Sequence, residues 1–351
     1  MGQNMFAESL LKWFERHGRD LPWRKVKDPY IIWLSEIILQ QTRVAQGTPY
    51  FHRFYEEFPT ISLFAKADLS EILRMWQGLG YYSRARNMHY AAQQVMEKYA
   101  GVFPTEYKEL LKLKGIGEYT AAAISSFARN EPRAVLDGNV YRVLSRYLGI
   151  YTPINSSAGK REFTEIANKM LDKKHPGDYN QAIMDFGALQ CKPRNPDCET
   201  CVLKLNCAAY QNSRVEDLPV KLKKKASKNR YLHYFIIQKA QKTLMSRRGT
   251  NDVWAKLYEF PHIETKGDLS LPELLETADF QAWFSNPTIV QIGPCIKHIL
   301  SHQNIYAKFY RIENPEALKI EKSTWNYFMS DNLDKLAKHK LIFSFLESNS
   351  L

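Results

Sequence analysis

Four cysteines within seventeen residues constrain the fold of this chain more than any other feature of its sequence. They are Cys191, Cys198, Cys201 and Cys207, spaced C-x6-C-x2-C-x5-C directly after a helical pattern. Four thiolates so close together suit zinc or an iron-sulfur cluster, and the spacing does not choose between them. The plain alternative is four ordinary buried thiols. The loop between the first two cysteines, KPRNPD, is basic, so Arg194 is a candidate contact for a phosphate group.

From residue 5 to about residue 210, apolar residues recur at spacings of three and four, which predicts successive helices. The stretches with this periodicity are 5–18, 28–44, 51–58, 68–80, 83–101, 105–113, 117–130, 138–150, 157–171 and 178–191. No convincing strand pattern interrupts them. We therefore expect residues 1–210 to form an all-α region.

The composition changes after Tyr210, because residues 211–230 are basic and carry few apolar anchors. Such a stretch is typical of a linker between domains, although it could also lie along a nucleic-acid duplex. Beyond it, 231–351 predicts an α+β domain of ordinary size. The expected strands are 231–238, 242–248, 288–294 and 304–312, and the expected helices are 271–284 and 331–348.

The charge of the chain points toward a polyanionic partner. Its 49 Lys and Arg residues outnumber 37 Asp and Glu residues, which gives a net charge of +12, and 13% of the residues are aromatic. This combination favours contact with a phosphate backbone and stacking on bases, while the simpler reading is a solvated basic surface. The N-terminus lacks a signal-peptide pattern, and no apolar run approaches the ~20 residues of a membrane span. We expect a cytoplasmic protein that does not enter a membrane.

One carboxylate lies in a segment that is otherwise almost entirely apolar. Residues 31–39 read IIWLSEIIL, with Glu36 near the middle, and Asp28 followed by Pro29 is an N-cap and first-turn pattern. A buried carboxylate must be paired, hydrogen-bonded or held protonated by a raised pKa. The last state is what a general acid requires, whereas the plain alternative is a satisfied core carboxylate.

Two further motifs carry candidate chemistry. In LKLKGIGEYTAAAI, residues 111–124, Gly115 and Gly117 permit a tight turn between helices that leaves backbone amides exposed beside Lys114. Such a hairpin can hold a DNA phosphate, although it could be an ordinary turn between two helices. In AVLDGNVYRVL, Asp137 is either a helix N-cap or a second carboxylate that complements Glu36. A glycosyl transfer uses such a pair, one acid for the leaving group and one carboxylate for the sugar cation.

These motifs together resemble those of the helix-hairpin-helix DNA glycosylase superfamily and, within it, the MutY family of adenine DNA glycosylases. The resemblance covers most of the first 210 residues and extends weakly to VWAKLYEFP at 253–261, which is similar to the Nudix-like domain of that family. The stretches that carry it are LPWR at 21–24, WLSEIILQQTRV at 33–44, QGLGYYSRARN at 77–87, LKGIGEYTAAAI at 113–124, LDGNVYRVLSR at 136–146, NQAIMDFGALQC at 180–191 and the four cysteines.

The resemblance implies a role for each matching residue. Glu36 would protonate the extruded adenine and later act on the water that completes the hydrolysis. Asp137 would stabilise the deoxyribosyl cation. Tyr119 would position Asp137, and it stands where the endonuclease III enzymes have a lysine nucleophile. The remaining matches divide into residues for the adenine pocket and the base stack (Trp23, Arg24, Gln41, Thr42, Tyr81 and Gln181) and residues for the DNA backbone (Arg84, Lys114, Gly115, Gly117 and Arg194).

The C-terminal match implies a second site that recognises the DNA. In the family a Phe-Ser-His stretch approaches the 8-oxoguanine opposite the adenine, and here residues 300–302 are Leu-Ser-His. Ser301 and His302 match that stretch, whereas Leu300 departs from it. Residues 231–351 contain no GxxxxxE followed by REUxEExG, so we do not expect this domain to hydrolyse nucleotides.

The predicted protein is therefore a multidomain enzyme: an all-α helix-hairpin-helix glycosylase region with a four-cysteine iron-sulfur loop, followed by an α+β Nudix-like domain. Residues 1–210 form the first region, with a hairpin lobe at about 23–133 and a cluster lobe of 1–22 plus 134–210. The linker is 211–230 and the Nudix-like domain 231–351. The cofactor would be one 4Fe-4S cluster, or zinc as the alternative, and the partner would be duplex DNA with an adenine/8-oxoguanine mispair, bound by a monomer.

We predict a monofunctional enzyme that hydrolyses the N-glycosidic bond of adenine opposite 8-oxoguanine or guanine. Two alternatives remain at this stage. One is a bifunctional endonuclease III-like glycosylase for oxidised pyrimidines, and the other is a non-catalytic, metal-stabilised DNA-binding protein.

Overall fold

The structure, a computed structural model, describes residues 2–223 and 227–349, so residues 224–226 of the expected linker lie outside the described residues. The chain divides into two compact units. The first consists of Met1–Lys66 and Asn87–Lys224, and the second of Ala67–Arg86 and Lys225–Leu351. Residues 67–86 thus group with the C-terminal part of the chain, whereas the sequence analysis placed them in the N-terminal region.

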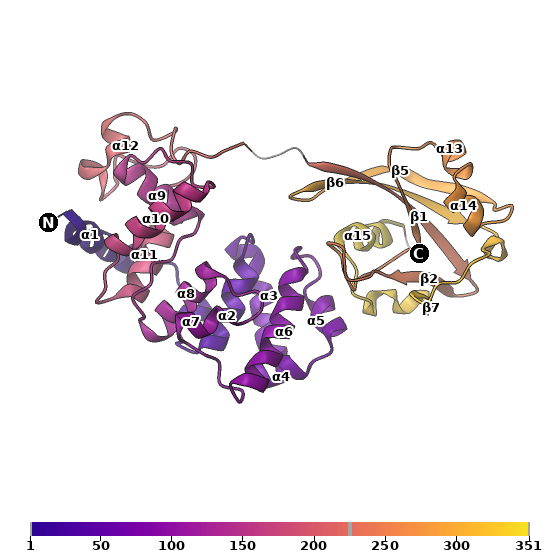
Figure 1. Ribbon diagram of the computed structural model, residues 1–351, viewed down its shortest axis with the longest axis horizontal. Helices are drawn as coiled ribbons and strands as arrows, with labels where there is room; N and C mark the ends of the chain where they lie inside the picture. The colour runs from indigo at the N-terminus through magenta and orange to yellow at the C-terminus, as the bar shows by residue number, and fades with distance from the viewer. Residues whose placement is uncertain (1, 224–226, 350–351) are drawn as a thin grey trace. The chain divides into compact units, whose positions relative to one another are not determined.

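Every secondary-structure element in the described residues of the first unit is a helix, which confirms the all-α expectation (Figure 1). Its helices are α1 (Gly2–His17), α2 (Pro29–Leu39), α3 (Val44–Glu57), α4 (Ile61–Lys66), most of α6 (Ser83–Lys98), α7 (Tyr107–Leu110), α8 (Glu118–Arg129), α9 (Gly138–Leu148), α10 (Ser157–Met170), α11 (Pro176–Leu189) and α12 (Ala208–Gln211). Short 3-10 helices lie at Pro22–Arg24 and Lys204–Asn206. No helix in the described ranges is long and apolar enough to cross a membrane.

The helix expected over 28–44 ends early. It begins as expected, with the Asp28 carboxylate accepting the Tyr30 amide at 2.8 Å, but α2 stops at Leu39 and α3 starts at Val44. Gln41 between them has a φ of 56°, in the left-handed region that side chains with a β-carbon rarely adopt. The apolar periodicity continues across this break, which is why the pattern alone could not locate it.

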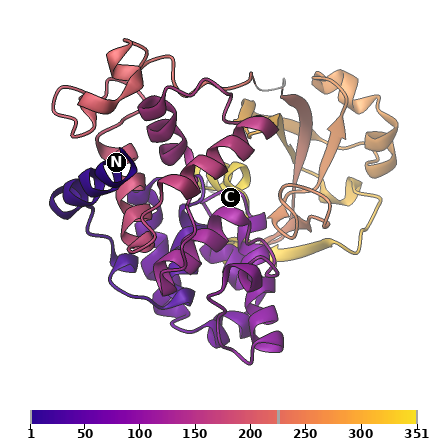
Figure 2. The same cartoon turned by 60° about the vertical axis from the view of Figure 1, so that its left-hand side comes forward.

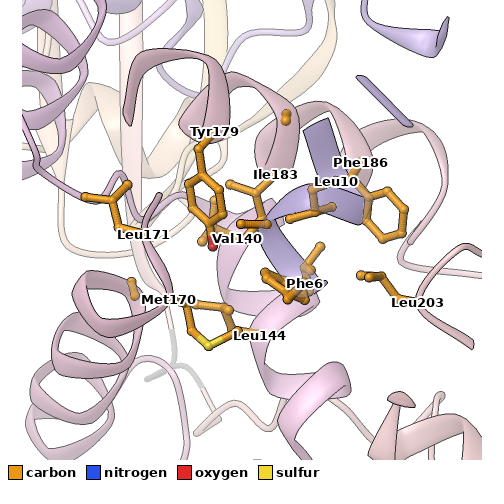
Figure 3. Packing of buried hydrophobic residues seen from close by; sticks show 14 of the residues in the cluster. Phe6, Leu10, Val140, Leu144, Met170, Leu171, Tyr179, Ile183, Phe186 and Leu203 are labelled. Carbon is orange, nitrogen blue, oxygen red and sulfur yellow. The ribbon is translucent and has the colours of Figure 1, made fainter. Parts of the chain in front are cut away.

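Helices from the two ends of the first unit share one core. Phe6 and Leu10 of α1 point toward Val140 and Leu144 of α9, and Phe186 of α11 completes the packing (Figure 3). Phe6, Leu10 and Leu144 are at most 1% exposed. Cys191 and Cys201 pack against the edge of the same cluster. This core therefore joins the N-terminal helix to the cysteine loop, although some 180 residues separate them.

A mixed sheet forms the centre of the second unit (Figures 1 and 2). Its strands are β1 (Lys228–Lys239), β2 (Lys242–Arg247), β3 (Tyr258–Glu259), β4 (His262–Thr265), β5 (Ile289–Ile299), β6 (Gln303–Ile312) and β7 (Trp325–Met329). The main order is β3-β2-β1-β6-β5, in which β1 and β6 are parallel and the other pairs antiparallel. The four predicted strands are present, and β3, β4 and β7 were not predicted because they are short or largely exposed.

The helices of the second unit are shorter than the sequence analysis expected. The segment 271–284 forms two helices, α13 (Leu271–Leu275) and α14 (Ala278–Trp283), because Thr277 caps the second one. The segment 331–348 forms a 3-10 helix at Ser330–Lys335 and the helix α15 (Lys340–Asn349). Helix α5 (Leu69–Met75) and the first residues of α6 also belong to this unit. The α+β class is confirmed.

Candidate active site

Glu36 is buried on α2, and in the described residues its carboxylate accepts a hydrogen bond from one side chain. Nine consecutive residues of this helix, 30–38, are buried, and the Glu36 residue is 8% exposed. The Tyr119 hydroxyl donates a hydrogen bond of 2.9 Å to Glu36 Oε2. Burial raises the pKa of Glu36 to about 7, against smaller lowering effects of the Tyr119 bond and the Arg24 charge, and the Asp137 carboxylate raises it further. The carboxyl is therefore poised to hold a proton near neutral pH.

Tyr119 lies in the first turn of α8 and faces both carboxylates. Burial, followed by the charges of Glu36 and Asp137, raises its pKa well above the ordinary value, so the hydroxyl stays a donor. The resemblance implied that Tyr119 positions Asp137, but its hydrogen bond goes to Glu36. The Asp137 carboxylate is held by donors from its own helix instead.

Asp137 is the N-cap of α9, which confirms the plain interpretation of this residue without excluding a second role. Its Oδ1 accepts the amides of Asn139 and Val140, each at 2.8 Å, and its Oδ2 accepts the Asn139 side-chain amide at 2.7 Å. Burial raises its pKa, against the lowering effects of these bonds and of the Arg142 charge. The bonds fix the direction of the carboxylate.

One cavity of about 530 Å³ brings the two carboxylates together. A volume of this size is typical of a pocket for a small organic ligand. Among the predicted residues, those that line this cavity are Trp23, Arg24, Glu36, Thr42, Tyr119, Asp137 and Gln181. Residues from five separate stretches of the sequence thus meet at one site.

Asp185 on α11 is a buried charge that the sequence analysis did not select. Its side chain is 0% exposed and accepts the Arg24 guanidinium through two bonds of 2.8 Å. Arg19 donates three more bonds to the same carboxylate, from its backbone amide and from Nε and Nη2. Burial raises the pKa of Asp185, but the arginine bonds outweigh it and lower the pKa to about 2. The available signal was the one used for Glu36: an acid between apolar residues of a helix, in AIMDFGAL.

Asn139 is a second residue that the sequence analysis missed. Its backbone and side chain both hold Asp137, and its Oδ1 accepts a bond of 2.8 Å from Arg142 Nη2. Asn139 also lines the cavity. The sequence offered only its position two residues after Asp137, which does not separate it from other polar residues at the start of a helix.

The glycine turn between α7 and α8 has the geometry that the motif predicts. Gly115 has a φ of 80°, and a β-carbon there would lie 2.7 Å from the Asn87 side chain. Lys114, Gly115 and Gly117 are exposed, whereas Ile116 between the glycines is buried. The Lys114 amide donates to the Gln94 side chain at 2.8 Å. The turn thus presents a lysine and backbone to solvent in front of the α8 N-terminus.

The four cysteines surround one small cavity of about 30 Å³. Arg146 Nη1 lies 3.5 Å from Cys191 Sγ and also donates to the Lys192 carbonyl at 2.7 Å. Burial, together with the neighbouring thiols, raises the pKa of Cys198. In the described part of the chain no group of three or more His, Cys, Asp or Glu side chains is arranged around a point where a metal ion could sit. Arg194 lies exposed in the loop between Cys191 and Cys198.

The two residues matched to the base stack share an uncommon backbone conformation. Gln41 in the first unit has a φ of 56° and is exposed, and Tyr81 in the second unit has a φ of 47° and is 47% exposed. Such strain often marks functional positions. Arg84, expected at the DNA backbone, is 9% exposed and donates to the carbonyls of Leu79 and Gly80, each at 3.2 Å. It supports the loop that carries Tyr81.

Ser301 and His302 form the exposed turn between β5 and β6. The Tyr81 hydroxyl and the Ser301 hydroxyl lie 2.5 Å apart, within the second unit. Residues 78–82 and 298–303 line a cavity of about 350 Å³ together with Val253, Trp254 and Lys340. The structure thus brings two predicted contact residues, Tyr81 and Ser301, to one cavity wall.

Comparisons with known proteins assign a separate family to each end of the chain. The family model of the HhH-GPD superfamily base excision DNA repair protein matches residues 34–169, and that of the NUDIX domain matches residues 233–348. Among solved structures, that of a thermostable thymine-DNA glycosylase is 30% identical and has a TM-score of 0.56, covering 60% of this chain and 97% of that one. The fold and site therefore define a DNA glycosylase of base excision repair with a C-terminal NUDIX domain.

Curated relatives narrow the assignment. The adenine DNA glycosylase of Buchnera aphidicola subsp. Baizongia pistaciae is 36% identical over 86% of this chain and 84% of its own length. The adenine DNA glycosylase of Rattus norvegicus is 30% identical over 91% of this chain and 73% of its own. The chain belongs to the adenine DNA glycosylase family.

Proposed function

We propose that this chain hydrolyses the N-glycosidic bond of adenine mispaired with 8-oxoguanine or guanine in duplex DNA, and that it acts in the cytoplasm as a monomer. One observation carries the proposal: Glu36, whose pKa burial raises to about 7, faces the same cavity as the fixed carboxylate of Asp137. An acid that retains its proton beside a carboxylate with a fixed direction is the pair that glycosidic cleavage requires.

In this mechanism Glu36 donates its proton to the adenine ring as the bond to the sugar breaks. Positive charge then develops on the deoxyribose, and the Asp137 carboxylate stabilises it or bonds to it briefly. Three donors already hold Asp137, so its direction is set before the substrate arrives. Glu36, now a carboxylate, takes the proton of the attacking water. Tyr119 keeps Glu36 oriented through its hydroxyl.

Adenine itself would occupy the cavity beside Trp23, Arg24 and Gln181. Trp23 is 5% exposed and lies edge-on to Phe51 at 5.1 Å, so its ring offers a fixed apolar wall. Extrusion of the base from the duplex costs a few kcal/mol, and Gln41, Thr42 and Tyr81 would occupy the space that it leaves. Lys114, Gly115, Gly117 and Arg194 would hold phosphates.

The four thiols fit a 4Fe-4S cluster in the chemistry of their donors, with zinc as the alternative. Cys191, Cys198, Cys201 and Cys207 line one cavity, and Arg146 stands beside Cys191, where it would offset the negative charge of thiolates. When bound, the group would fix the loop that carries Arg194. Iron and sulfide in the purified protein, with a yellow-brown colour, would support the cluster, whereas a colourless protein with stoichiometric zinc would contradict it.

We further propose that residues 1–210 divide into a hairpin lobe at about 23–133 and a cluster lobe of 1–22 plus 134–210, followed by the linker 211–230 and the domain 231–351. The shared core of α1, α9 and α11 supports the composition of the cluster lobe. Ser301 and His302 of the last domain would read the 8-oxoguanine, with Tyr81 holding Ser301.

Single-turnover cleavage tests the function directly. The full chain is incubated in excess over duplexes that hold adenine opposite 8-oxoguanine, guanine or thymine, and free adenine is measured. We expect release from the first two duplexes by the wild type and loss of release in Glu36→Gln. Adenine release that is equal in the wild type and this variant would contradict the proposal and favour a non-catalytic DNA-binding protein.

Borohydride trapping distinguishes the bifunctional alternative. Lys27 also lines the cavity, so an amine is present on its wall. We expect no trapped covalent adduct with DNA, because Tyr119 occupies the position of the nucleophilic lysine and bonds to Glu36. A trapped adduct that disappears in Lys27→Ala would contradict the monofunctional mechanism.

A further inference from the structure

The buried carboxylate of Asp185 holds two cations at the wall of the proposed adenine pocket. Within the described residues its five hydrogen bonds come from Arg19 and Arg24, and the two Arg24 bonds form a parallel, bidentate pair. The carboxylate side chain is 0% exposed, while the Arg19 and Arg24 side chains are 29% and 14% exposed. A buried anion that accepts this many charged donors fixes their positions.

Arg24 lies near two acids whose pKa values are shifted in opposite directions: the pKa of Asp185 is lowered and that of Glu36 is raised. Both of its Nη atoms donate to Asp185, and no hydrogen bond or ion pair joins it to Glu36 among residues 2–223 and 227–349. Even so, Arg24 lies close enough for its charge to lower the pKa of Glu36. The Glu36 carboxyl thus senses this guanidinium across the cavity without binding it.

Other charged groups also surround Glu36. The groups whose charge or hydrogen bond acts on the Glu36 carboxyl are Tyr119, Arg24 and Asp137. The cavity wall also carries the charged side chains of Arg19, Lys27, Arg43 and Asp178. Among the cations of this wall that the structure describes, Arg19 and Arg24 donate to Asp185. Loss of the Asp185 charge would therefore leave two cations on this wall without their shared carboxylate.

We propose that Asp185 is a positioning residue of the glycosylase: it holds the Arg24 guanidinium against α11 and so prevents Arg24 from forming an ion pair with Glu36. The inference rests on the proposed function, since it assigns a cause to the protonated state that Glu36 needs as an acid. Without the Asp185 charge, Arg24 would be able to turn to another carboxylate of the same cavity, that of Glu36. An ion pair there favours the ionised form, and the acid would lose its proton at neutral pH.

The test is the pH dependence of single-turnover adenine release by the full chain, with the active fraction measured at each pH. A general acid works below its pKa, so the wild-type rate should fall as the pH rises through about 7. In Asp185→Asn this alkaline limb should move down by about one pH unit, and part of the rate lost at pH 8 should return on acidification. A merely structural role would lower the rate by one factor at every pH.

Two further variants complete the test. In the double variant Arg24→Gln with Asp185→Asn the misplaced charge is gone, so the limb should return to the wild-type position or above it. Asp172→Asn is the matched control, because it removes a partly buried carboxylate beside α11 that lies outside the cavity and bonds to Lys174 and His175. Its limb should stay in place.

The outcomes separate the two proposals. A wild type without adenine release at any pH would overturn the proposed function. A wild-type limb near pH 7 together with an unmoved limb in Asp185→Asn would overturn the role of Asp185 alone. If Asp185→Asn yields no folded protein, Arg24→Gln replaces it in the test. The alkaline limb of Arg24→Gln should move to higher pH, and an alkaline limb that does not move would overturn the proposal.

Discussion

Glu36 in the first unit and Glu259 in the second are both buried glutamates, yet their surroundings drive their protonation in opposite directions. Glu36 is 8% exposed and accepts one bond, from the neutral Tyr119 hydroxyl. Glu259 is 0% exposed and accepts Arg248 Nη1 on both oxygens, at 2.6 and 2.8 Å. Burial raises the pKa in both cases, but only at Glu259 do charged partners reverse the shift.

Glu259 has further partners besides Arg248. His262 and His339 approach its oxygens at 3.0 and 3.1 Å, and the Tyr234 hydroxyl donates at 3.0 Å. Despite burial, the histidines and Arg248 bring the pKa of Glu259 well below its ordinary value. Burial therefore does not decide whether a glutamate serves as an acid. The number and charge of the hydrogen-bond donors decide whether the glutamate keeps its proton, and Glu36 has fewer donors than Glu259.

The largest expected effect is that of Glu36→Gln on catalysis. Glutamine keeps the shape but has no proton to donate, so adenine release in single-turnover reactions should fall about 10³-fold. The measurement is the rate of release from an adenine/8-oxoguanine duplex at pH 7.

The stability of the same variant shows whether the loss reflects misfolding. The pKa of Glu36 rises from 4.5 to about 7 on folding, so ionised Glu36 costs stability as the pH rises through that window. At pH 8 the neutral glutamine should make the first unit more stable by about 3 kcal/mol. A variant that is inactive and also less stable at pH 8 would contradict this account.

The next largest effect is that of Glu259→Gln on stability. It removes the anion from Arg248 while the guanidinium stays buried, which should destabilise the second unit by about 3–5 kcal/mol. Urea unfolding followed by tryptophan fluorescence measures this. The matched control is Glu264→Gln, which breaks the more exposed ion pair with Arg230 and should cost about 1 kcal/mol at most.

The sign of the pH dependence sharpens the same comparison. The pKa of Glu259 lies below 4.5 in the folded chain, so its stabilisation is present above pH 4.5 and is lost as the pH falls through the lower, folded-state value. The second unit of Glu259→Gln should therefore lose less stability on acidification than that of the wild type. An equal loss in both proteins would contradict the role of the network.

A smaller effect is expected from Tyr119→Phe. This change removes the bond that lowers the pKa of Glu36, so the alkaline limb of the rate profile should move to higher pH. The maximal rate should fall about fivefold, the value of one neutral hydrogen bond. A limb that moves to lower pH would mean that Tyr119 acts mainly on Asp137, as the resemblance first implied.

The smallest effect concerns the second unit. Ser301→Ala removes the hydroxyl that lies 2.5 Å from the Tyr81 hydroxyl, and it should lower the preference for 8-oxoguanine over guanine about threefold. Competition between the two duplexes measures this preference. Tyr81→Phe is the matched comparison, since it removes the other half of the same bond, and an unchanged preference in both variants would contradict a reading role for Ser301.

Much of this architecture could be predicted from local patterns, because helix periodicity and caps act over a few residues. The burial of Glu36, the Asp137 cap and the all-α region follow from such signals. The break at Gln41 could not be predicted, since a left-handed residue has no periodic signature. Asp185 was missed for another reason. Its role depends on partners that folding brings close, such as Arg19, which lies 166 residues from Asp185 in the sequence.

The central claim is that Glu36 holds a proton near neutral pH because it is buried and its hydrogen-bond donor among the described residues, the Tyr119 hydroxyl, is neutral. The most direct test is the pH dependence of single-turnover adenine release by the wild-type chain, with Glu36→Gln as reference. The account predicts an alkaline limb near pH 7 that is absent from the residual activity of the variant. A limb near 4.5, the ordinary value for a glutamate, or a limb that persists in Glu36→Gln, would contradict it.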